Sequence, residues 1–376
     1  MLIQDLMNLA IEKKSSDIHL KSNKHLILRI NGNLISIEEF FFSTEEIKNL
    51  IYSVMSKYQI EKFEKEKELD FSYDLENHAR FRINVFYHTG AIGAILRIIP
   101  LKISTIEELN LPLILKDIAL KESGLILCTG PTGCGKSTTL SSMIDYINVT
   151  KSCHIVTIEN PIEFIFQDKK SFISQRELGI DTNSLSNALK HVLRQDPNVI
   201  LVGEMRDLET ISTAITAAET GHLVLSTLHT IDAKQTIDRI LDQFPANQQQ
   251  IIQRQLSQIL IAIFSQRLVK SSSGENRIPI VEIMINSPSI KSLIANGKIE
   301  EILDMIENSK RYYGMQSFNQ ALIDLYKEKK INLEDAINIS PKPDDLKLRI
   351  AGLSSGGDLI EKNKEDAFSH LNNKFL

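Results

Sequence analysis

One glycine-rich segment constrains this chain more than any other part of its sequence. Residues 130–137 read Gly-Pro-Thr-Gly-Cys-Gly-Lys-Ser, a complete match to the pattern GxxxxGK[ST]. The apolar run Leu125–Cys128 precedes it, and a helical pattern, Thr138–Ile147, follows it. In this setting, backbone N–H groups of the loop close around phosphate oxygens, and the positive end of the helix adds to the attraction. The segment therefore predicts a strand, a phosphate-binding loop and a helix, with Lys136 near the β/γ-phosphates and the Ser137 hydroxyl on Mg²⁺.

Short apolar runs continue to alternate with helical stretches after this loop. They are Leu125–Cys128, His154–Ile158, Val199–Val202 and Leu223–Ser226. Such alternation is typical of a parallel sheet with helices on both faces. We therefore predict an α/β domain here, with a helical subdomain after Pro288.

The N-terminal part has a different, mainly strand-like pattern. It begins with a short helical pattern, in which Leu2, Leu6, Leu9 and Ile11 are expected to face a core. Predicted strands are Asp17–Leu20, Leu26–Ile30, Leu34–Ile37, Ala79–Tyr87 and Ala91–Ile98, with a hairpin signal at Asn31-Gly32. Predicted helices are Thr44–Ser56, capped by Ser43, and Lys57–Glu66. This pattern predicts a small α+β module.

The composition limits the class of protein. The 376 residues are 42% apolar and 24% charged, with a formal net charge of −5, which excludes a disordered or fibrous chain and argues against a nucleic-acid binder. No apolar run approaches the ~20 residues that span a bilayer, and the N-terminus does not read as a signal peptide. Three cysteines are too few for a disulfide framework, so we expect a reduced, cytosolic compartment.

Two predicted strand ends beyond the glycine-rich loop carry carboxylates. Val199–Val202 leads to Glu204, and His154–Ile158 leads to Glu159 and Glu163. Carboxylates at this edge of a sheet can place negative charge near a metal ion, or orient a water for attack on a phosphoryl group. Taken alone, Glu159 and Glu163 are also compatible with a solvated turn.

Three further side chains have two interpretations each. His222 and His229 flank the Leu223 strand without zinc-ligand spacing, so they either cap the strand locally or sense the nucleotide. Cys134 lies at a helix N-terminus, where a thiol can be redox-active, but we interpret it as a small side chain tolerated by the loop.

Four stretches together carry a family resemblance. They read SSDIHL…LRINGNL, GLILCTGPTGCGKSTTL, IENPIEF and VILVGEMRDLETISTAITAAETGHLVLSTLHT. These stretches resemble the twitching-motility (PilT) family of the secretion ATPase superfamily, over about residues 1–340. The resemblance implies a cytoplasmic homohexamer that retracts type IV pili, works with ATP and Mg²⁺, and acts on an inner-membrane platform protein from outside the bilayer.

The residue patterns predict a domain division, and the resemblance implies the PAS-like and RecA-like identity of its two main domains. The division comprises a PAS-like N-terminal domain (1–99), a linker (100–112), a RecA-like ATPase domain (113–286), a helical C-terminal subdomain (287–340) and a mobile tail (341–376).

The family pattern assigns roles to particular residues. Glu163 is the expected catalytic glutamate, Glu204 is the Walker B carboxylate near Mg²⁺, and His229 belongs to the His box. Arg82 and Arg97 are expected to act on phosphate across subunits, whereas Arg80 is expected in a surface salt bridge. The residues implied to bind nucleotide are Gly130, Pro131, Thr132, Gly133, Cys134, Gly135, Lys136, Ser137, Thr138, Glu159 and His222.

The chain departs from the family pattern at two places, and three rival functions stay open. Asn160 stands where the family usually has Asp, and Ser289–Asn296 (SIKSLIAN) only partly matches the family motif AIRNLIRE. The rival functions are a pilus assembly or type II secretion ATPase, a nucleic-acid motor, and a nucleotide-binding regulator with little turnover. Assembly and secretion ATPases usually carry a four-cysteine module that this sequence lacks.

Overall fold

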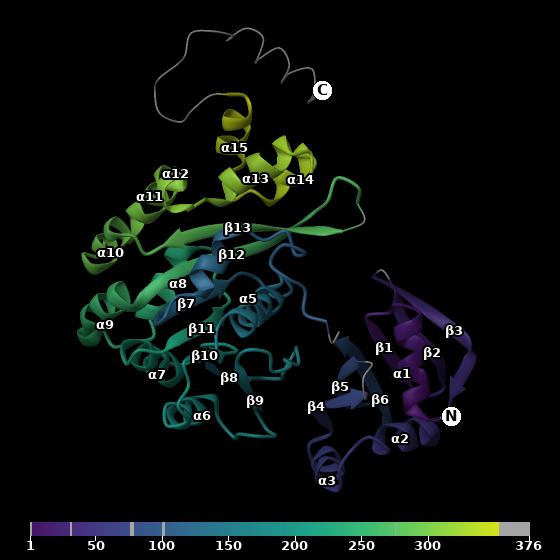
Figure 1. Ribbon diagram of the computed structural model, residues 1–376. Coiled ribbons are helices and arrows are strands. Elements are labelled where there is room, and N and C mark those ends of the chain that lie inside the picture. Colours follow the sequence, from purple (N-terminus) through teal and green to yellow (C-terminus); the bar gives the residue numbers. More distant parts are fainter. Residues whose placement is uncertain (1, 31, 76–78, 100–101, 275, 353–376) are drawn as a thin grey trace. The chain divides into compact units, whose positions relative to one another are not determined.

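The chain forms two compact units in a computed structural model that describes residues 2–30, 32–75, 79–99, 102–274 and 276–352 (Figure 1). The first unit contains the described residues up to 103 together with 159–167; the second contains 104–158 and the described residues from 168 onward. Each unit has its own sheet and core, which confirms the predicted α/β class with an α+β module at the N-terminus.

The first unit is an antiparallel sheet with helices packed on one face. Its six strands lie in the order β3-β2-β1-β6-β5-β4. The strands are β1 (Asp17–Lys21), β2 (Lys24–Ile30), β3 (Asn33–Phe42), β4 (Glu68–Leu75), β5 (Ala79–His88) and β6 (Ala91–Ile99). The helices are α1 (Ile3–Glu12), α2 (Thr44–Tyr52) and α3 (Lys57–Glu66), and Ser43 caps α2 as predicted. The predicted hairpin residue Asn31 lies outside the described residues, between paired strands β2 and β3.

Alternation along the strands decides which residues enter this core. Ile18, Leu28, Leu96 and Ile83 are fully buried and lie opposite one another in register. Residues one position away, such as Asp17 and Arg97, therefore lie on the opposite face of the sheet, away from the helices. The register thus separates an apolar face from a charged face.

Two details of the first unit differ from the sequence expectation. Helix α1 buries Ile3, Leu6, Met7 and Ala10. Leu2 is 66% exposed, because it is the N-cap residue and lies before the first turn of the helix. Strand β4 was not predicted, because its acidic residues alternate with apolar ones at the edge of the sheet.

The second unit is a mixed sheet of seven strands, ordered β13-β12-β7-β11-β10-β8-β9. The strands are β7 (Gly124–Thr129), β8 (His154–Glu159), β9 (Phe172–Glu177), β10 (Val199–Val202), β11 (Leu223–Leu228), β12 (Leu260–Lys270) and β13 (Arg277–Ile285). Five neighbouring strands run parallel: β8, β10, β11, β7 and β12. The first four of these confirm the predicted parallel sheet. Strand β13 is antiparallel to β12. Strands β9, β12 and β13 were not predicted; β12 follows a helix with no turn between them, so no local signal separates the two.

Helices cover both faces of this sheet. Helix α5 (Lys136–Thr150) packs on β7 and β11, and it buries Leu140, Met143 and Ile144. The other face is covered mainly by α6 (Leu185–Val192), α7 (Leu208–Glu219), α8 (Ala233–Leu241), α9 (Ala246–Ile259) and α10 (Pro288–Ala295). The short helix α4 (Ile114–Ala119) packs on α5. Pro100 of the predicted linker lies outside the described residues, and residues 102–113 contain neither helix nor strand.

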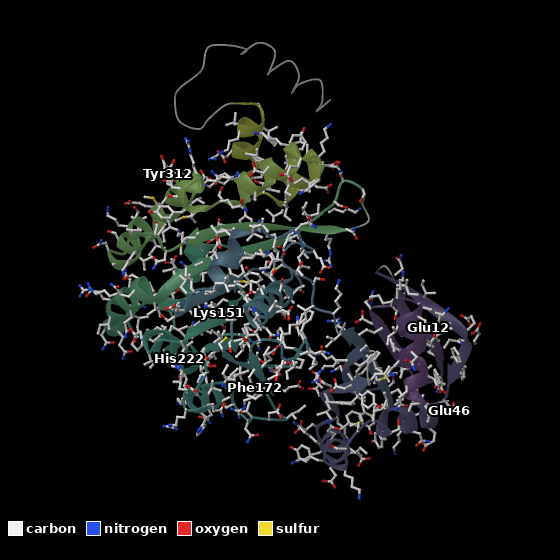
Figure 2. All side chains as sticks on the ribbon, in the orientation of Figure 1. Glu12, Glu46, Lys151, Phe172, His222 and Tyr312 are labelled. Atoms are coloured by element: carbon white, nitrogen blue, oxygen red, sulfur yellow. The ribbon has the colours of Figure 1, made fainter. Side chains whose placement is uncertain are left out.

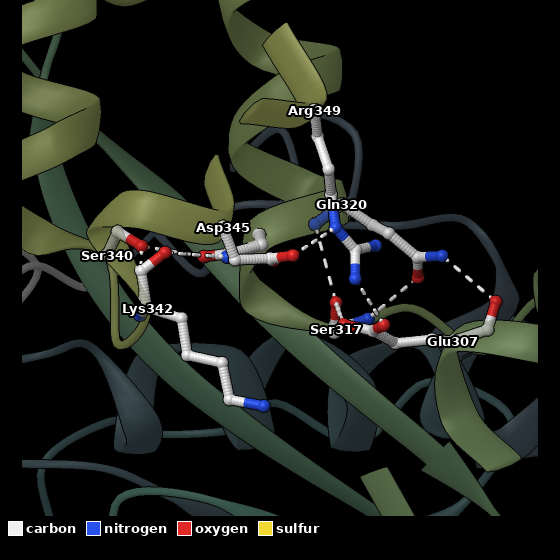
Figure 3. A network of polar contacts seen from close by, with 8 residues as sticks. Glu307, Ser317, Gln320, Ser340, Lys342, Asp345 and Arg349 are labelled. Atoms are coloured by element: carbon white, nitrogen blue, oxygen red, sulfur yellow. Dashed lines mark hydrogen bonds and ion pairs between the residues drawn. The ribbon is translucent and has the colours of Figure 1, made fainter. Parts of the chain in front are cut away.

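The helical C-terminal subdomain is longer than predicted. It contains η1 (Ile299–Glu301), α11 (Ile302–Asn308), α12 (Lys310–Tyr313), α13 (Phe318–Lys327), α14 (Leu333–Ile339) and α15 (Pro343–Ile350). The prediction that a mobile tail begins at residue 341 is wrong, because α15 packs on the rest of the subdomain. Leu346 is fully buried, and Arg349 binds Glu307 and Asp345 at 2.7 and 2.9 Å (Figure 3). Residues 353–376 of the predicted tail lie outside the described residues.

The partial motif SIKSLIAN forms most of α10. Its family-like residues Ile290, Leu293 and Ile294 are all buried, whereas Ser289 and Asn296 are exposed. The residues that this segment shares with the family motif are therefore the ones that pack in the core. Within the described residues, no helix combines the length and apolarity needed to cross a bilayer.

Candidate functional site

The glycine-rich loop joins the end of β7 at Thr129 to the start of α5 at Lys136. Gly130 has φ +139°, and a Cβ added there would lie 2.3 Å from the Gln266 carbonyl oxygen and 2.7 Å from Cys134 Sγ. Gly135 is the N-cap of α5, with φ +92°. Both positions require glycine, since a side chain would strain the backbone and collide with its neighbours. The predicted strand–loop–helix arrangement is confirmed.

Gln266 on β12 holds this loop from the side. Its Nε2 donates a hydrogen bond of 2.7 Å to the Cys134 carbonyl, and its Oε1 accepts one of 2.8 Å from Thr139 Oγ1. The side chain is 3% exposed, so both of its polar atoms are satisfied inside the protein. Sequence reasoning missed Gln266, because nothing local to β12 indicates its contact with a loop so far away in the chain.

The residues of the loop and of the first turn of α5 differ in burial and in their contacts. Lys136 is buried, and its Nζ donates to the carbonyl oxygens of Gly130 and Pro131 at 2.8 and 3.1 Å. Ser137 and Thr138 are partly exposed in the first turn of α5. The predicted binding residues Pro131, Thr132 and Gly133 are exposed at the tip of the loop.

Cys134 is an inward-facing part of the same loop. Its side chain is buried, and this burial raises the pKa of the thiol, which disfavours the reactive thiolate. This environment agrees with the interpretation of Cys134 as a small packing residue.

Glu204 and His229 come from two separate sequence motifs and contact each other in the structure. Glu204 follows β10, His229 follows β11, and His229 Nε2 is 3.2 Å from Glu204 Oε1. Arg206, which sequence reasoning missed, contacts Glu204 Oε2 at 2.7 Å. Burial alone would raise the pKa of Glu204, but the hydrogen bond from Arg206 and the charge of His229 outweigh it and lower the pKa below its ordinary value. Glu204 is therefore an anion at neutral pH.

The backbone beside Glu204 is fixed by both neighbouring strands. Gly203 N–H donates to the Ile158 carbonyl at 2.8 Å, and Met205 N–H donates to the Thr227 carbonyl at 3.1 Å. The carboxylate therefore stands on a rigid strand end, at the same edge of the sheet as the loop that follows β7.

His222 does not lie at the edge of the sheet that carries the glycine-rich loop and Glu204. It precedes β11, and the register pairs Leu223 with Gly124, at the start of β7, while Leu228 pairs with Thr129 at its end. His222 instead lies beside α7, where its Nδ1 is 2.9 Å from the Ala217 carbonyl oxygen (Figure 2). A strand of six residues spans roughly 20 Å, so contact between His222 and the loop of its own chain, as expected for a nucleotide ligand, is contradicted. Local capping, the first of the two interpretations given for this residue, agrees with the contact between His222 and the Ala217 carbonyl.

Glu159 and Glu163 are carried by the 159–167 segment of the first unit. Glu159 ends β8 and is 8% exposed, whereas Glu163 is partly exposed. The peptide bond between Asn160 and Pro161 is cis.

Arg82 and Arg97 lie directly opposite each other on β5 and β6. Arg97 Nε donates to Asp17 Oδ1 at 2.9 Å, and Arg82 Nε lies 3.8 Å from Asp70 Oδ1. The side chains of Arg97 and Arg82 are 64% and 37% exposed, respectively. Arg80 forms an ion pair with Asp74 at 3.0 Å, but its side chain is 10% exposed, so only the Asp74 side of the expected surface salt bridge lies at the surface.

The chain matches known proteins over most of its length. Residues 1–338 match the family described as Type II/IV secretion system protein. A twitching motility protein of Neisseria gonorrhoeae is 46% identical over 80% of each chain. The type IV pilus retraction ATPase PilT of Pseudomonas aeruginosa is 42% identical over 89% of this chain and 96% of its own.

A solved structure shares the fold. The crystal structure of the pilus retraction motor PilT with bound ADP is 45% identical, with a TM-score of 0.86 over 92% of this chain and 98% of that one. Together with the strand–loop–helix geometry at Lys136, these matches establish the family. The chain belongs to the type II/IV secretion system protein family, as a P-loop ATPase of its twitching-motility (PilT) group.

Proposed function

We propose that this protein is a hexameric motor that couples ATP hydrolysis to domain motion and drives the retraction of type IV pili. The observation that carries the proposal is the near full-length similarity to PilT, including the structure with bound ADP, combined with a complete P-loop. The proposed partners are five further copies of the chain and an inner-membrane platform protein. The proposed location is the cytoplasmic side of the pilus base.

The P-loop supplies the nucleotide site. Its backbone N–H groups bind phosphate oxygens, and Lys136 exchanges its bonds to the Gly130 and Pro131 carbonyls for the β/γ-phosphates. The hydrogen bonds from Gln266 keep these donors in place before nucleotide arrives. Such preorganisation supports binding, because little reorganisation is needed.

The residues present fit Mg²⁺ as a companion of ATP. The Ser137 hydroxyl and the ionised Glu204 carboxylate are hard oxygen donors of the kind Mg²⁺ prefers, with Glu204 acting through water. When bound, Mg²⁺ neutralises charge on the phosphates. His229 and Arg206 hold Glu204 in one orientation at this edge.

The remaining roles concern the hydrolytic step. Glu163 orients the attacking water, and Arg82 and Arg97 of a neighbouring subunit stabilise charge that develops on the γ-phosphoryl group. The exposed, cross-strand arrangement of these two arginines supports such a role, because two cations side by side favour an anion between them.

The test is deletion of the gene in the organism that carries it, followed by counts of surface pili and an assay of surface motility. Cells that keep or accumulate pili but do not move support retraction. Bald cells would instead indicate an assembly ATPase, and cells with normal pili and motility would overturn a pilus function. Complementation with Lys136→Ala separates loss of ATP turnover from loss of the protein.

Two biochemical measurements distinguish a pilus motor from a regulator and from a nucleic-acid motor. Phosphate release by the purified hexamer tests for a nucleotide-binding regulator, for which turnover would be negligible. Binding to single-stranded DNA over a range of salt concentrations tests for a nucleic-acid motor, because phosphate contacts give a steep salt dependence.

A further inference from the structure

The face of the N-terminal sheet that lies away from its helices carries a row of charged side chains. Across four neighbouring strands the register places Arg29 opposite Asp17, Asp17 opposite Arg97, and Arg97 opposite Arg82. Residues directly opposite each other share a face, with Cβ atoms about 5 Å apart. One carboxylate therefore stands within a row of three guanidinium groups.

Asp17 is the buried centre of this row. Its side chain is 6% exposed, whereas the side chain of Arg97 is 64% exposed. Oδ1 accepts a hydrogen bond of 2.9 Å from Arg97 Nε, while Oδ2 accepts one of 2.8 Å from Ser16 Oγ and lies 3.6 Å from Arg29 Nε. Each oxygen is thus engaged, and the carboxylate is fixed on β1.

The charge of Asp17 persists despite its burial. Desolvation alone would raise the pKa, but the hydrogen bonds from Arg97 and Ser16 outweigh it and lower the pKa below its ordinary value. The carboxylate is therefore ionised throughout the neutral range, and it offsets the repulsion of the neighbouring guanidinium groups.

Asp17 holds the Arg97 guanidinium at one nitrogen only. The contact uses Nε, and within the described residues the two terminal nitrogens of Arg97 make no bond to the protein. Arg82 is held more loosely, at 3.8 Å from Asp70. An arginine side chain that is fixed at Nε keeps a free pair of donors in a defined direction, which suits a phosphoryl oxygen.

We propose that Asp17 is a positioning residue for catalysis: it fixes Arg97 in the orientation that meets the γ-phosphoryl group bound by the neighbouring subunit, with Arg29 bracing the carboxylate from the other side. This role rests on the proposed action of Arg97 across subunits. Without Asp17, Arg97 samples many rotamers and must be ordered during the hydrolytic step itself, so turnover falls while binding of nucleotide at the P-loop remains.

The test compares Asp17→Asn in two backgrounds, wild type and Arg97→Ala, using full-length hexamers. Asp17→Asn keeps the shape of the side chain and removes its charge. The expected result is a roughly 10-fold lower kcat with KM and nucleotide affinity within about 2-fold of wild type. In the Arg97→Ala background the same substitution should have no further effect on kcat, because residues acting through one another are not additive.

Asp74→Asn is the matched control. It makes the same chemical change on the same sheet, at the exposed partner of Arg80, and should leave kcat unchanged. Thermal unfolding and the hexamer content of every variant are measured in parallel. If Asp17→Asn does not fold, Asp17→Ser replaces it and is read in the same way.

The outcomes separate two kinds of failure. A slow Arg97→Ala combined with a wild-type kcat for Asp17→Asn, or with an additive loss in the double variant, overturns the positioning role alone. A wild-type kcat for Arg97→Ala overturns both this role and the proposed action of the arginines across subunits.

Discussion

Thr139 Oγ1 donates a hydrogen bond of 2.8 Å to Gln266 Oε1, although 127 residues separate the two in the chain. Through Nε2 the same amide also holds the Cys134 carbonyl. One side chain of β12 therefore ties the first turns of α5 to the glycine-rich loop before it. The conformation of the phosphate-binding loop depends on a strand that lies outside its own strand–loop–helix unit.

Gln266→Leu should weaken nucleotide binding while the fold persists, because it removes both hydrogen bonds and keeps a similar volume. A net loss of about 1 kcal/mol for each bond predicts a rise in the dissociation constant of roughly 10-fold or more. Titration with a fluorescent ADP analogue measures it. Thr139→Val, which removes only one of the bonds, should show a smaller rise. Unchanged affinity in Gln266→Leu would show that the loop holds its shape alone.

Lys136→Ala should abolish ATP hydrolysis and greatly weaken nucleotide binding, because it removes the cation that faces the β/γ-phosphates. Steady-state phosphate release is the measurement. Lys151→Ala is a matched control: Lys151 also donates to two carbonyl oxygens, of Leu120 and Lys121, but at the far end of α5 (Figure 2). Hydrolysis by Lys136→Ala within a few-fold of wild type would contradict the assignment.

Glu163→Gln should retain ATP binding and lose turnover, since it neutralises the carboxylate proposed to orient water without changing its shape. Glu204→Gln should instead shift the Mg²⁺ dependence of hydrolysis to higher concentrations. Phosphate release across a Mg²⁺ series compares the two. If Glu163→Gln hydrolyses ATP normally while Glu204→Gln is inactive, the two roles must be exchanged.

Arg82→Ala and Arg97→Ala should each form hexamers and bind ATP, yet hydrolyse it poorly, by about 10³-fold if they act as phosphate-stabilising cations. Mixing either variant with Lys136→Ala should restore part of the activity, because some interfaces then pair an intact P-loop with an intact arginine. Verified mixed hexamers without any rescue would exclude action across subunits. Full activity of a demonstrably monomeric preparation would exclude it as well.

Glu282 should make the stability of the second unit depend on pH. Its side chain is 4% exposed on β13 and accepts a hydrogen bond of 2.9 Å from the Ala233 N–H, beside a cavity of about 160 Å³ that Arg267 also lines. Burial raises the pKa of Glu282 to about 7. Between its ordinary pKa near 4.5 and this value, the unfolded chain releases the proton while the folded chain keeps it, so stability falls as pH rises.

Glu282→Gln cannot ionise and can still accept the bond from Ala233. It should therefore be more stable than wild type at pH 8, by up to about 3 kcal/mol, and similar to it near pH 5. Denaturant unfolding at both pH values measures the difference, with Glu334→Gln at an exposed site of α14 as the control. An equal difference at both pH values would rule out titration of Glu282 as the cause.

Much of the site follows from local pattern. The glycine-rich loop, Lys136 and the strand leading to Glu204 are recognisable because each depends on residues within about 10 positions along the chain. The same applies to the Ser43 cap of α2, where hydrogen bonds join residues three apart. These features are determined by the sequence because their physical causes are local.

Other features depend on which strands lie side by side, and this only the tertiary structure decided. Strand register places His229 beside Glu204 but His222 at the opposite end of β11, although the two histidines occupy equivalent positions around the strand in sequence. It also brings Asp17 of β1 to Arg97 of β6, although 80 residues separate the two. Gln266 reaches the loop in the same way, through pairing of β12 with β7. Such pairing results from burial of whole strands in a shared core, and local periodicity contains no record of the partner strand.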